Sequence, residues 1–297
     1  MKQAMIIINP SSGKEEALEY VRQVEDILRN KGYDVTVNET AKPLDATKFC
    51  LTACKEYFDL VVSIGGDGTL HETINGLVDQ EHRPKLGVVP LGTVNDFARA
   101  LSIPLDPKKA IHTLASSTVK TVDIGKMNDR LFANSVAAGS LAGSLSSVSS
   151  EEKTKLGAFA YVKEGIKELM NTSPHPLTII HDGETWIGES PLFLAALTNS
   201  VGGFEKMIPH ASVDDGLIHC FIVKDINVLN TITVGTSLLF GSLKDHKDIV
   251  YFTARHVHVS STEQIHTNVD GEDGPPLPLE LRIMPSHIQV IVSEELM

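Results

Sequence analysis

Three short apolar segments in the first third of the chain each run directly into a polar segment that contains glycine or proline. The apolar segments are residues 4–9, 59–64 and 86–90. The polar segments that follow them are NPSSG at 9–13, GGDGT at 65–69 and PLGTVND at 90–96. The carboxyl ends of parallel strands lie at one edge of a sheet, where open α/β folds bind ligands, so we expect these polar segments to gather there.

Helical periodicity between the apolar segments supports a parallel sheet. From Lys14 to Lys31 the apolar residues recur at the spacing of one helix face, and Gly32 is a natural helix stop. Residues 33–38 alternate as a strand does, and a helical stretch follows Pro43. This alternation predicts a doubly wound α/β domain over residues 1–124.

The pattern changes after about residue 120. Short β-like segments then follow one another, with a hairpin turn at Asn128-Asp129 and helical interruptions near 155–171 and 226–241. This pattern predicts an antiparallel β-sandwich over residues 125–284. We expect the last strand, 287–292, to return to the first domain, which residues 285–297 would then complete.

Composition excludes several classes of protein. The 26 basic and 38 acidic residues give a net charge of −12, which provides no electrostatic basis for binding nucleic acid. No apolar stretch approaches the ~20 residues that a transmembrane helix needs. The start of the chain has no signal-peptide pattern, and 3 cysteines do not make a disulfide framework. We therefore expect a cytoplasmic location.

The glycine-rich segment 65–69 is suited to binding phosphate. Glycines let backbone N–H groups approach a ligand closely, and the helix that follows directs its N-terminal N–H groups to the same place. The alternative is a tight strand-to-helix turn in which Asp67 caps the helix. Neither a P-loop nor a Rossmann fingerprint is present, because Glu15 follows Lys14 and no G-x-G-x-x-G opens a helix.

The ordered set of motifs resembles the diacylglycerol kinase catalytic domain family, and within it the soluble bacterial lipid kinases. NPSSG, GGDGT and PLGTVNDFARAL (90–101) carry the resemblance, which continues in VDIGKMNDRLFANS (122–135), the 209–216 segment and NVDGE (268–272). It implies an ATP-binding α/β domain like those of NAD kinase and phosphofructokinase, followed by a β-sandwich that takes the lipid. The implied reaction is Mg²⁺-dependent phosphorylation of a lipid hydroxyl by ATP, for example of diacylglycerol to phosphatidic acid.

The resemblance also implies roles for individual residues. Those matching the family's nucleotide contacts are Asn9, Pro10, Ser11, Ser12, Gly13, Thr40, Gly66, Asp67, Gly68, Thr69, Leu70, His71, Glu72, Thr93 and Asn95. A structural Mg²⁺ would be held by Ser212, Asp215 and Leu217. The segment 137–153 is richer in serine and alanine than the family pattern, which leaves the shape of the lipid pocket open.

Four carboxylates, at three places in the sequence, have both a functional and a structural interpretation. Asp67 could hold Mg²⁺ beside ATP or cap a helix, and Asp215 could hold a metal or merely close a turn. Asp270 and Glu272 flank a glycine, which suits a hairpin turn. They could also supply the general base that accepts the proton of the lipid hydroxyl, and the sequence does not show which of the two would do so.

A lipid substrate requires contact with a membrane. The net charge of −12 opposes broad attraction to anionic lipid, so we expect a local patch and transient, peripheral binding at the inner membrane face. The oligomeric state is open, a homodimer included.

Two alternatives remain for the function: an NAD kinase, which shares the glycine-rich loop, and a catalytically silent module that binds nucleotide or lipid. His256 and His258 share a strand face, where solvated histidines are favoured over metal ligands.

Overall fold

The structure is a computed structural model that describes residues 2–12, 17–77, 79–139, 173–203, 208–224, 237 and 241–294. The chain divides into two compact units. Unit 1 comprises Met1–Asp123 and Pro285–Met297, and unit 2 comprises Ile124–Met284. The chain passes between them within two strands, β5 (Val119–Met127) and β16 (Leu279–Ile291).

Unit 1 contains the predicted parallel sheet, whose strands run in the order β2-β1-β3-β4 and then the end of β16. The end of β16 joins β4 in parallel, with Val290 opposite Leu86. The remaining elements of unit 1, in chain order, are β1 (Lys2–Ile8), α1 (Ala17–Asn30), β2 (Tyr33–Glu39), α2 (Asp45–Lys55), β3 (Leu60–Gly65), α3 (Asp67–Asn75), β4 (Lys85–Pro90), α4 (Asp96–Ala100) and α5 (Pro107–Thr113).

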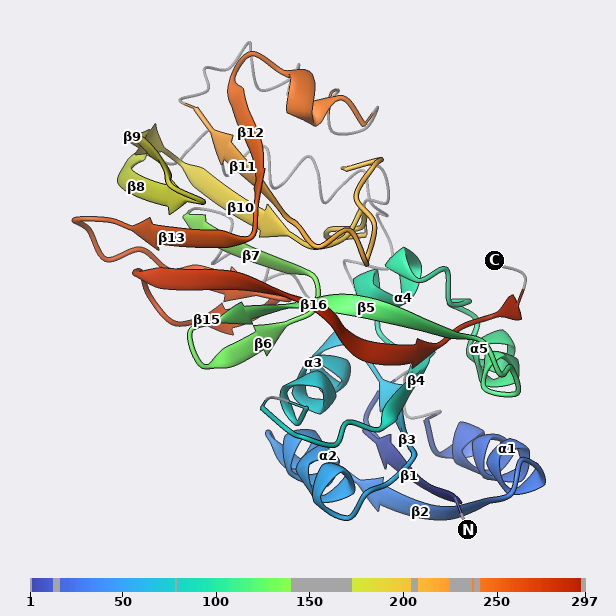
Figure 1. Ribbon diagram of the computed structural model, residues 1–297. Helices are drawn as coiled ribbons and strands as arrows, with labels where there is room; N and C mark the ends of the chain where they lie inside the picture. The colour runs from blue at the N-terminus through green and yellow to red at the C-terminus, as the bar shows by residue number, and fades with distance from the viewer. Residues whose placement is uncertain are drawn as a thin grey trace. The chain divides into compact units, whose positions relative to one another are not determined.

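Helices cover both faces of this sheet, with α1 and α5 on one side and α2 and α3 on the other (Figure 1). Strand β3 is buried at every position, as a parallel strand covered on both faces should be. One core cluster joins alternate residues of β1 and β3 to the apolar face of α1, where Val24 and Leu28 are fully buried. The prediction of a doubly wound α/β domain is confirmed.

Unit 2 consists of antiparallel strands in two sheets. One contains β9, β8, β13 and the start of β16, and the other has the order β12-β11-β10-β7-β14-β15. Phe132, Phe193 and Ile179 lie in one fully buried cluster with residues of both sheets. The predicted antiparallel sandwich is confirmed, whereas the helix predicted near 155–171, and all of the one near 226–241 except residues 237 and 241, lie outside the described residues. The bounds of these elements are β6 (Arg130–Phe132), β7 (Ser135–Gly139), β8 (His175–His181), β9 (Glu184–Ser190), β10 (Leu192–Ala196), β11 (Ile218–Val223), the 3-10 helix η2 (Leu243–Asp245), β12 (Ile249–Ala254), β13 (His256–Ser260), β14 (Thr267–Val269) and β15 (Glu272–Gly274).

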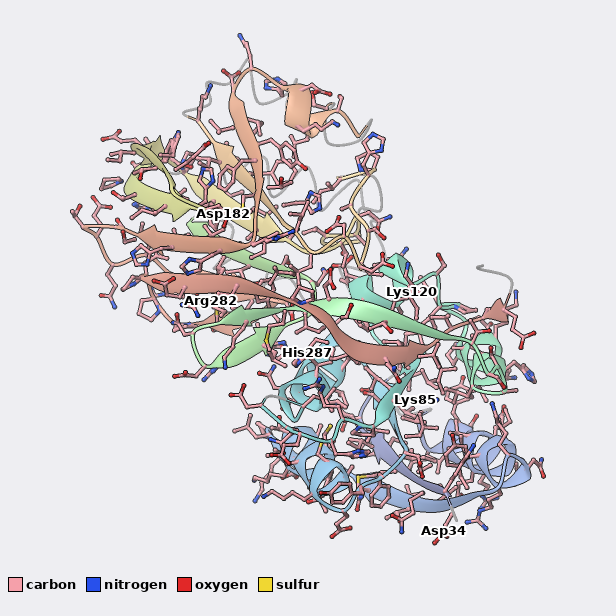
Figure 2. The ribbon with its side chains drawn as sticks, in the orientation of Figure 1. Asp34, Lys85, Lys120, Asp182, Arg282 and His287 are labelled. Atoms are coloured by element: carbon pink, nitrogen blue, oxygen red, sulfur yellow. The ribbon has the colours of Figure 1, made fainter. Side chains whose placement is uncertain are left out.

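Two hairpins of unit 2 turn on the same dipeptide. Asp182-Gly183 joins β8 to β9, and Asp270-Gly271 joins β14 to β15. Both residues of each turn have positive φ, at 44° and 95° in the first and 51° and 91° in the second. This conformation matches the twist of a two-residue hairpin and explains the Asp-Gly sequence. Asp182 is labelled among the side chains of unit 2 in Figure 2.

Candidate functional site

The polar segments that follow β1, β2, β3 and β4 meet at the carboxyl edge of the parallel sheet. The N–H of Asn9 donates to the carbonyl of Ile64 at 3.0 Å, and that of Thr40 donates to Ile8 at 2.8 Å. The N–H of Leu91 donates to Gly65 at 2.7 Å. Each loop therefore starts from a position that its neighbouring strand fixes.

Two glycines allow the β3–α3 and β4–α4 loops to lie against each other. A Cβ on Gly66 would lie 3.3 Å from the Cα of Gly92. A Cβ on Gly92 would lie 2.6 Å from Asn95 Oδ1 and 3.0 Å from the Cα of Gly66. Side chains at these two positions would force the loops apart, so the shape of this edge depends on their absence.

Asn95 and Asp67 hold the β4–α4 loop in its conformation. Asn95 adopts the left-handed conformation, with φ of 55°, and its side chain bonds both backbone groups of Gly92, at 3.0 Å to N–H and 2.7 Å to the carbonyl. Asp67 Oδ2 accepts the N–H of Asn95 at 2.9 Å. Arg99 donates from Nε to the carbonyl of Val94 at 2.7 Å, so this side chain anchors the loop.

The N-terminus of α3 is suited to an anion. Its N-cap residue, Gly66, has no side chain to cap the first-turn amides. These amides and the positive end of the helix dipole favour phosphate. Asn9 Nδ2 donates to Thr69 Oγ1 at 3.3 Å, so the loop that follows β1 is bonded to α3. The residues present therefore fit the phosphates of ATP.

Glu72, a predicted nucleotide contact, directs its carboxylate to the start of α2. Its two oxygens accept the N–H groups of Leu44 at 2.9 Å and Ala46 at 3.2 Å. Asp45 Oδ2 accepts two further N–H groups in the preceding loop, both at 3.1 Å. The amide of Ala41 is the main reason that the pKa of Asp45 lies below its ordinary value. These two carboxylates brace the segment that follows Thr40.

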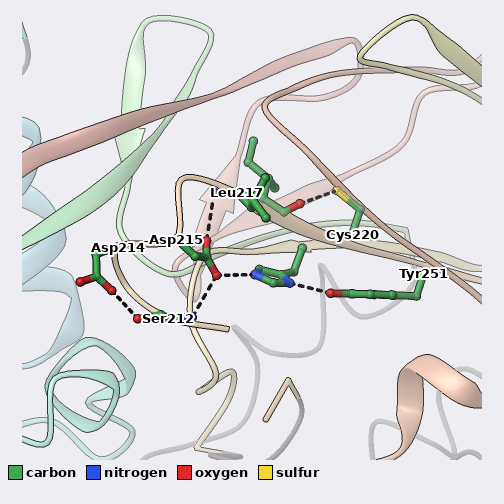
Figure 3. Close-up of polar contacts among 8 residues, drawn as sticks. Ser212, Asp214, Asp215, Leu217, Cys220 and Tyr251 are labelled. Carbon is green, nitrogen blue, oxygen red and sulfur yellow. Dashed lines mark hydrogen bonds and ion pairs between the residues drawn. The ribbon is translucent and has the colours of Figure 1, made fainter. Parts of the chain in front are cut away.

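The three predicted metal ligands lie together in one loop of unit 2 (Figure 3). Asp215 accepts the N–H groups of Ser212 and Leu217, each at 3.0 Å, and its Oδ2 lies 3.0 Å from His219 Nε2. Burial raises the pKa of Asp215, but the hydrogen bond with His219 and those from the two amides outweigh it, so the pKa lies below its ordinary value.

The donor set in this loop suits Mg²⁺. It offers the carboxylates of Asp214 and Asp215, the hydroxyl of Ser212, which donates to Asp214, and backbone carbonyl oxygens. Mg²⁺ takes few protein oxygens and retains several waters. In the parts of the chain that the structure describes, no group of three His, Cys, Asp or Glu side chains could hold a metal.

The two candidate bases occupy different positions in the β14–β15 hairpin. Asp270 is the first residue of the turn, and both of its carboxylate oxygens accept backbone N–H groups of the β6–β7 connection. Glu272 opens β15, opposite Val269, and is exposed. No side-chain hydrogen bond joins Glu272 to another described residue, so its carboxylate is the more available of the two.

Some predicted residues take other positions. Leu70 packs inward and is 7% exposed, so only its backbone can meet a ligand. His71 lies 3.2 Å from the amide of Asn75, from Nε2 to Nδ2. Gly13, Lys14 and most of the 137–153 segment lie outside the described residues. His256 and His258 share Glu280, at 2.6 and 2.7 Å, in place of a metal.

The chain matches two family models in succession. Residues 3–127 match the diacylglycerol kinase catalytic domain, and residues 134–292 match the YegS C-terminal NAD kinase beta sandwich-like domain. Within the described residues, no helix is long and apolar enough to cross a membrane. These matches define the chain as a kinase, and kinases of this kind take ATP as the phosphoryl donor.

The chain belongs to the diacylglycerol kinase family. It is 40% identical to a diacylglycerol kinase of Bacillus subtilis over 99% of this chain and 98% of that protein, and 39% identical to one of Staphylococcus carnosus. A crystal structure titled as a diacylglycerol kinase from Bacillus anthracis superposes with a TM-score of 0.84 at 28% identity. It covers 100% of this chain and 99% of that one. The sequence resemblance and the prediction of a lipid kinase are confirmed.

Proposed function

We propose that this protein transfers the γ-phosphoryl group of ATP to the hydroxyl of diacylglycerol and so makes phosphatidic acid. The observation that carries the proposal is the meeting of the glycine-rich loops at the carboxyl edge of the parallel sheet, beside the uncapped start of α3. The names of the relatives support diacylglycerol as the acceptor.

Unit 1 would be the ATP-binding domain and unit 2 the lipid-substrate domain. In unit 1 the loops after β1, β3 and β4 would hold the phosphates, with Thr40 and Thr93 as further contacts. Asp67 would stabilise this arrangement directly, through its bond to Asn95, and would also face the bound metal. Mg²⁺ would supply positive charge that neutralises the phosphates during transfer. A second, structural Mg²⁺ would bind Ser212, Asp215 and Leu217.

Proton removal from the lipid hydroxyl would fall to the β14–β15 hairpin. A general base must lie within hydrogen-bond reach of the hydroxyl and have a free lone pair to accept its proton. Glu272 meets the second condition better than Asp270, because the oxygens of Asp270 already accept backbone N–H groups. We therefore assign the proton acceptor to Glu272.

The test is label transfer from ATP that carries radioactive phosphorus in the γ position. The purified protein is offered diacylglycerol in mixed micelles, other lipid alcohols, or NAD, with and without Mg²⁺. We expect label in phosphatidic acid, dependent on Mg²⁺, and ~10²–10³-fold less label with Asp67→Ala. Label in NAD, or in no acceptor, would contradict the proposal, and label in another lipid would refute the substrate alone.

The acceptor resides in a bilayer, so we propose transient binding at the inner membrane face. Sedimentation with vesicles that contain diacylglycerol tests this contact. The oligomeric state is a separate question, and light scattering of the protein without vesicles would distinguish a monomer from a homodimer.

A further inference from the structure

The carboxylate of Asp270 gathers three consecutive backbone N–H groups. Oδ2 accepts from Ala133 at 2.7 Å, and Oδ1 accepts from Asn134 and Ser135, each at 2.9 Å. In return the N–H of Asp270 donates to the carbonyl of Ser135 at 2.9 Å. Four hydrogen bonds thus join the β14–β15 turn to the β6–β7 connection and the first residue of β7, more than 130 residues earlier in the chain.

The same contact recurs at a turn that carries no functional motif. Asp182 is the first residue of the β8–β9 turn, and its carboxylate accepts the N–H groups of Arg255 at 2.8 Å and His256 at 3.0 Å. Holding a hairpin to a distant strand through an aspartate is therefore a general structural device of unit 2. It does not by itself indicate a chemical role.

Buried polar side chains extend the contact on both sides of the Asp270 turn. Asn134 is 6% exposed, and its Oδ1 accepts from Thr198 Oγ1 at 2.6 Å. Asn268 is 3% exposed, and its Oδ1 accepts the N–H of Gly271 at 2.9 Å. The segments FANS and NVDGE, which resemble family motifs at the two ends of unit 2, meet here.

We propose that Asp270 is a positioning residue, which acts with Asn134 and Thr198 to hold the hairpin that presents Glu272. The inference rests on the proposed function for the role of Glu272. The contact itself lies wholly within unit 2 and holds whichever lipid is the acceptor. A bond to three amides orients the carboxylate of Asp270 toward the backbone, and Glu272, two residues on, is left to meet the hydroxyl.

The dependence of kcat on pH separates positioning from proton acceptance. Glu272→Gln should lower kcat by ~10²–10⁴-fold and remove the decline in rate at acid pH. Asp270→Asn retains one acceptor oxygen, so we expect a loss of ~10-fold with that decline unchanged, and a loss of ~10²-fold for Asp270→Ala. Thr198→Val, nearly isosteric, should lower kcat a few-fold with the same pH profile. If Asp270→Asn removes the acid decline while Glu272→Gln retains it, the proposal is overturned.

Hydrogen exchange gives a readout that needs no activity. The amides of residues 133–135 should be protected in the wild type and in Glu272→Gln, and should exchange at least about tenfold faster in Asp270→Asn. Unchanged protection in Asp270→Asn would refute the contact even if the enzyme phosphorylates diacylglycerol. If the wild type has no lipid kinase activity but the amides still exchange faster in Asp270→Asn, the proposed function is refuted and the contact stands.

Asp182→Asn is the matched control, because it removes the same kind of carboxylate from the same kind of turn. We expect it to lower the melting temperature while kcat stays within twofold of the wild type. A loss of kcat in Asp182→Asn equal to that in Asp270→Asn would mean that both variants act through general stability, and the positioning role would fail.

Discussion

The edge of the parallel sheet in unit 1 and the hairpin turns of unit 2 hold their backbones in place by opposite means. At the sheet edge, Gly66 and Gly92 allow two loops to approach because neither has a side chain. At the turns, Asp182 and Asp270 use a side chain to bind distant backbone amides. Nothing lies within 4 Å of a Cβ built on either turn glycine, Gly183 or Gly271.

This difference predicts that the two regions are sensitive to different kinds of substitution. A site that depends on close backbone contact is damaged by adding atoms, because the loops have nowhere to move. A turn held by a carboxylate is damaged by removing atoms, because buried amides lose their acceptor. We therefore expect added methyl groups to be most harmful in unit 1 and truncated carboxylates to be most harmful in unit 2.

Among the changes that test this comparison, the largest effect is expected from Gly92→Ala. The new Cβ would lie within 3.1 Å of Asn95 Oδ1, Gly66 Cα and Asp67 Oδ2, so the loop must shift. A displacement of about 1 Å can cost ~10²-fold, and we expect that loss in kcat/KM for ATP. Gly32→Ala is the control for activity: its Cβ meets nothing within 4 Å, so its φ of 81° should cost stability without moving these loops. Equal activity in the two variants would show that the contact is not needed.

A smaller effect is expected from Asp215→Ala. The change removes the acceptor of two amides and the partner of the buried His219, so we expect the free energy of unfolding to fall by ~1–3 kcal/mol. If this loop holds Mg²⁺, added Mg²⁺ should stabilise the wild type and not the variant. Thermal unfolding with and without Mg²⁺ measures both effects. If Mg²⁺ stabilises both proteins equally, the loop holds no Mg²⁺ and Asp215 only stabilises the turn.

Gly271→Ala should have a milder effect than Gly92→Ala. Its φ of 91° strains a residue that carries a Cβ, at a cost of about 1–2 kcal/mol, but no atom blocks the methyl group. We expect lower stability and a kcat within about tenfold of the wild type. Gly183→Ala should lose similar stability and no activity. A loss of activity in Gly271→Ala as large as that in Gly92→Ala would remove the distinction between the two regions.

The smallest effect concerns acid stability. Burial raises the pKa of Glu280, but hydrogen bonds from His258 and His256 outweigh it and hold the pKa below its ordinary value of 4.5. A lowered folded-state pKa gives stability that is complete above the unfolded value and is lost as pH falls through the folded value. Glu280→Gln should therefore lower stability at pH 6 and flatten its decline below pH 4.5. Chemical denaturation at several pH values measures this slope, and identical slopes would contradict it.

The local parts of this architecture could be predicted, and the long-range contacts could not. Strands β1, β3 and β4 each contain a mostly apolar run, and glycine in the segments that follow them indicates loops that approach a ligand. The bond from Asp270 to Ala133 spans 137 residues, and nothing in either segment says which strands will meet. Glu72 shows the same limit: its motif suggested a nucleotide contact, and nothing in the sequence indicated that its carboxylate accepts two amides at the start of α2. The spacing of apolar residues indicates whether a side chain faces the core or the solvent, but not which distant backbone amide it binds.

The path of β16 has a consequence for the order in which the protein folds during synthesis. Val290 pairs with β4, Ile291 belongs to the core cluster of unit 1, and the N–H of Val292 donates to Thr118. Residues up to Asp123 form most of unit 1, yet its sheet and core are complete only when residues 285–292 have also been synthesised. Unit 2 is continuous in sequence and can close earlier. The N-terminal-first order that domains usually follow would then be reversed, and a nascent chain stalled before residue 285 would expose the incomplete parallel sheet of unit 1.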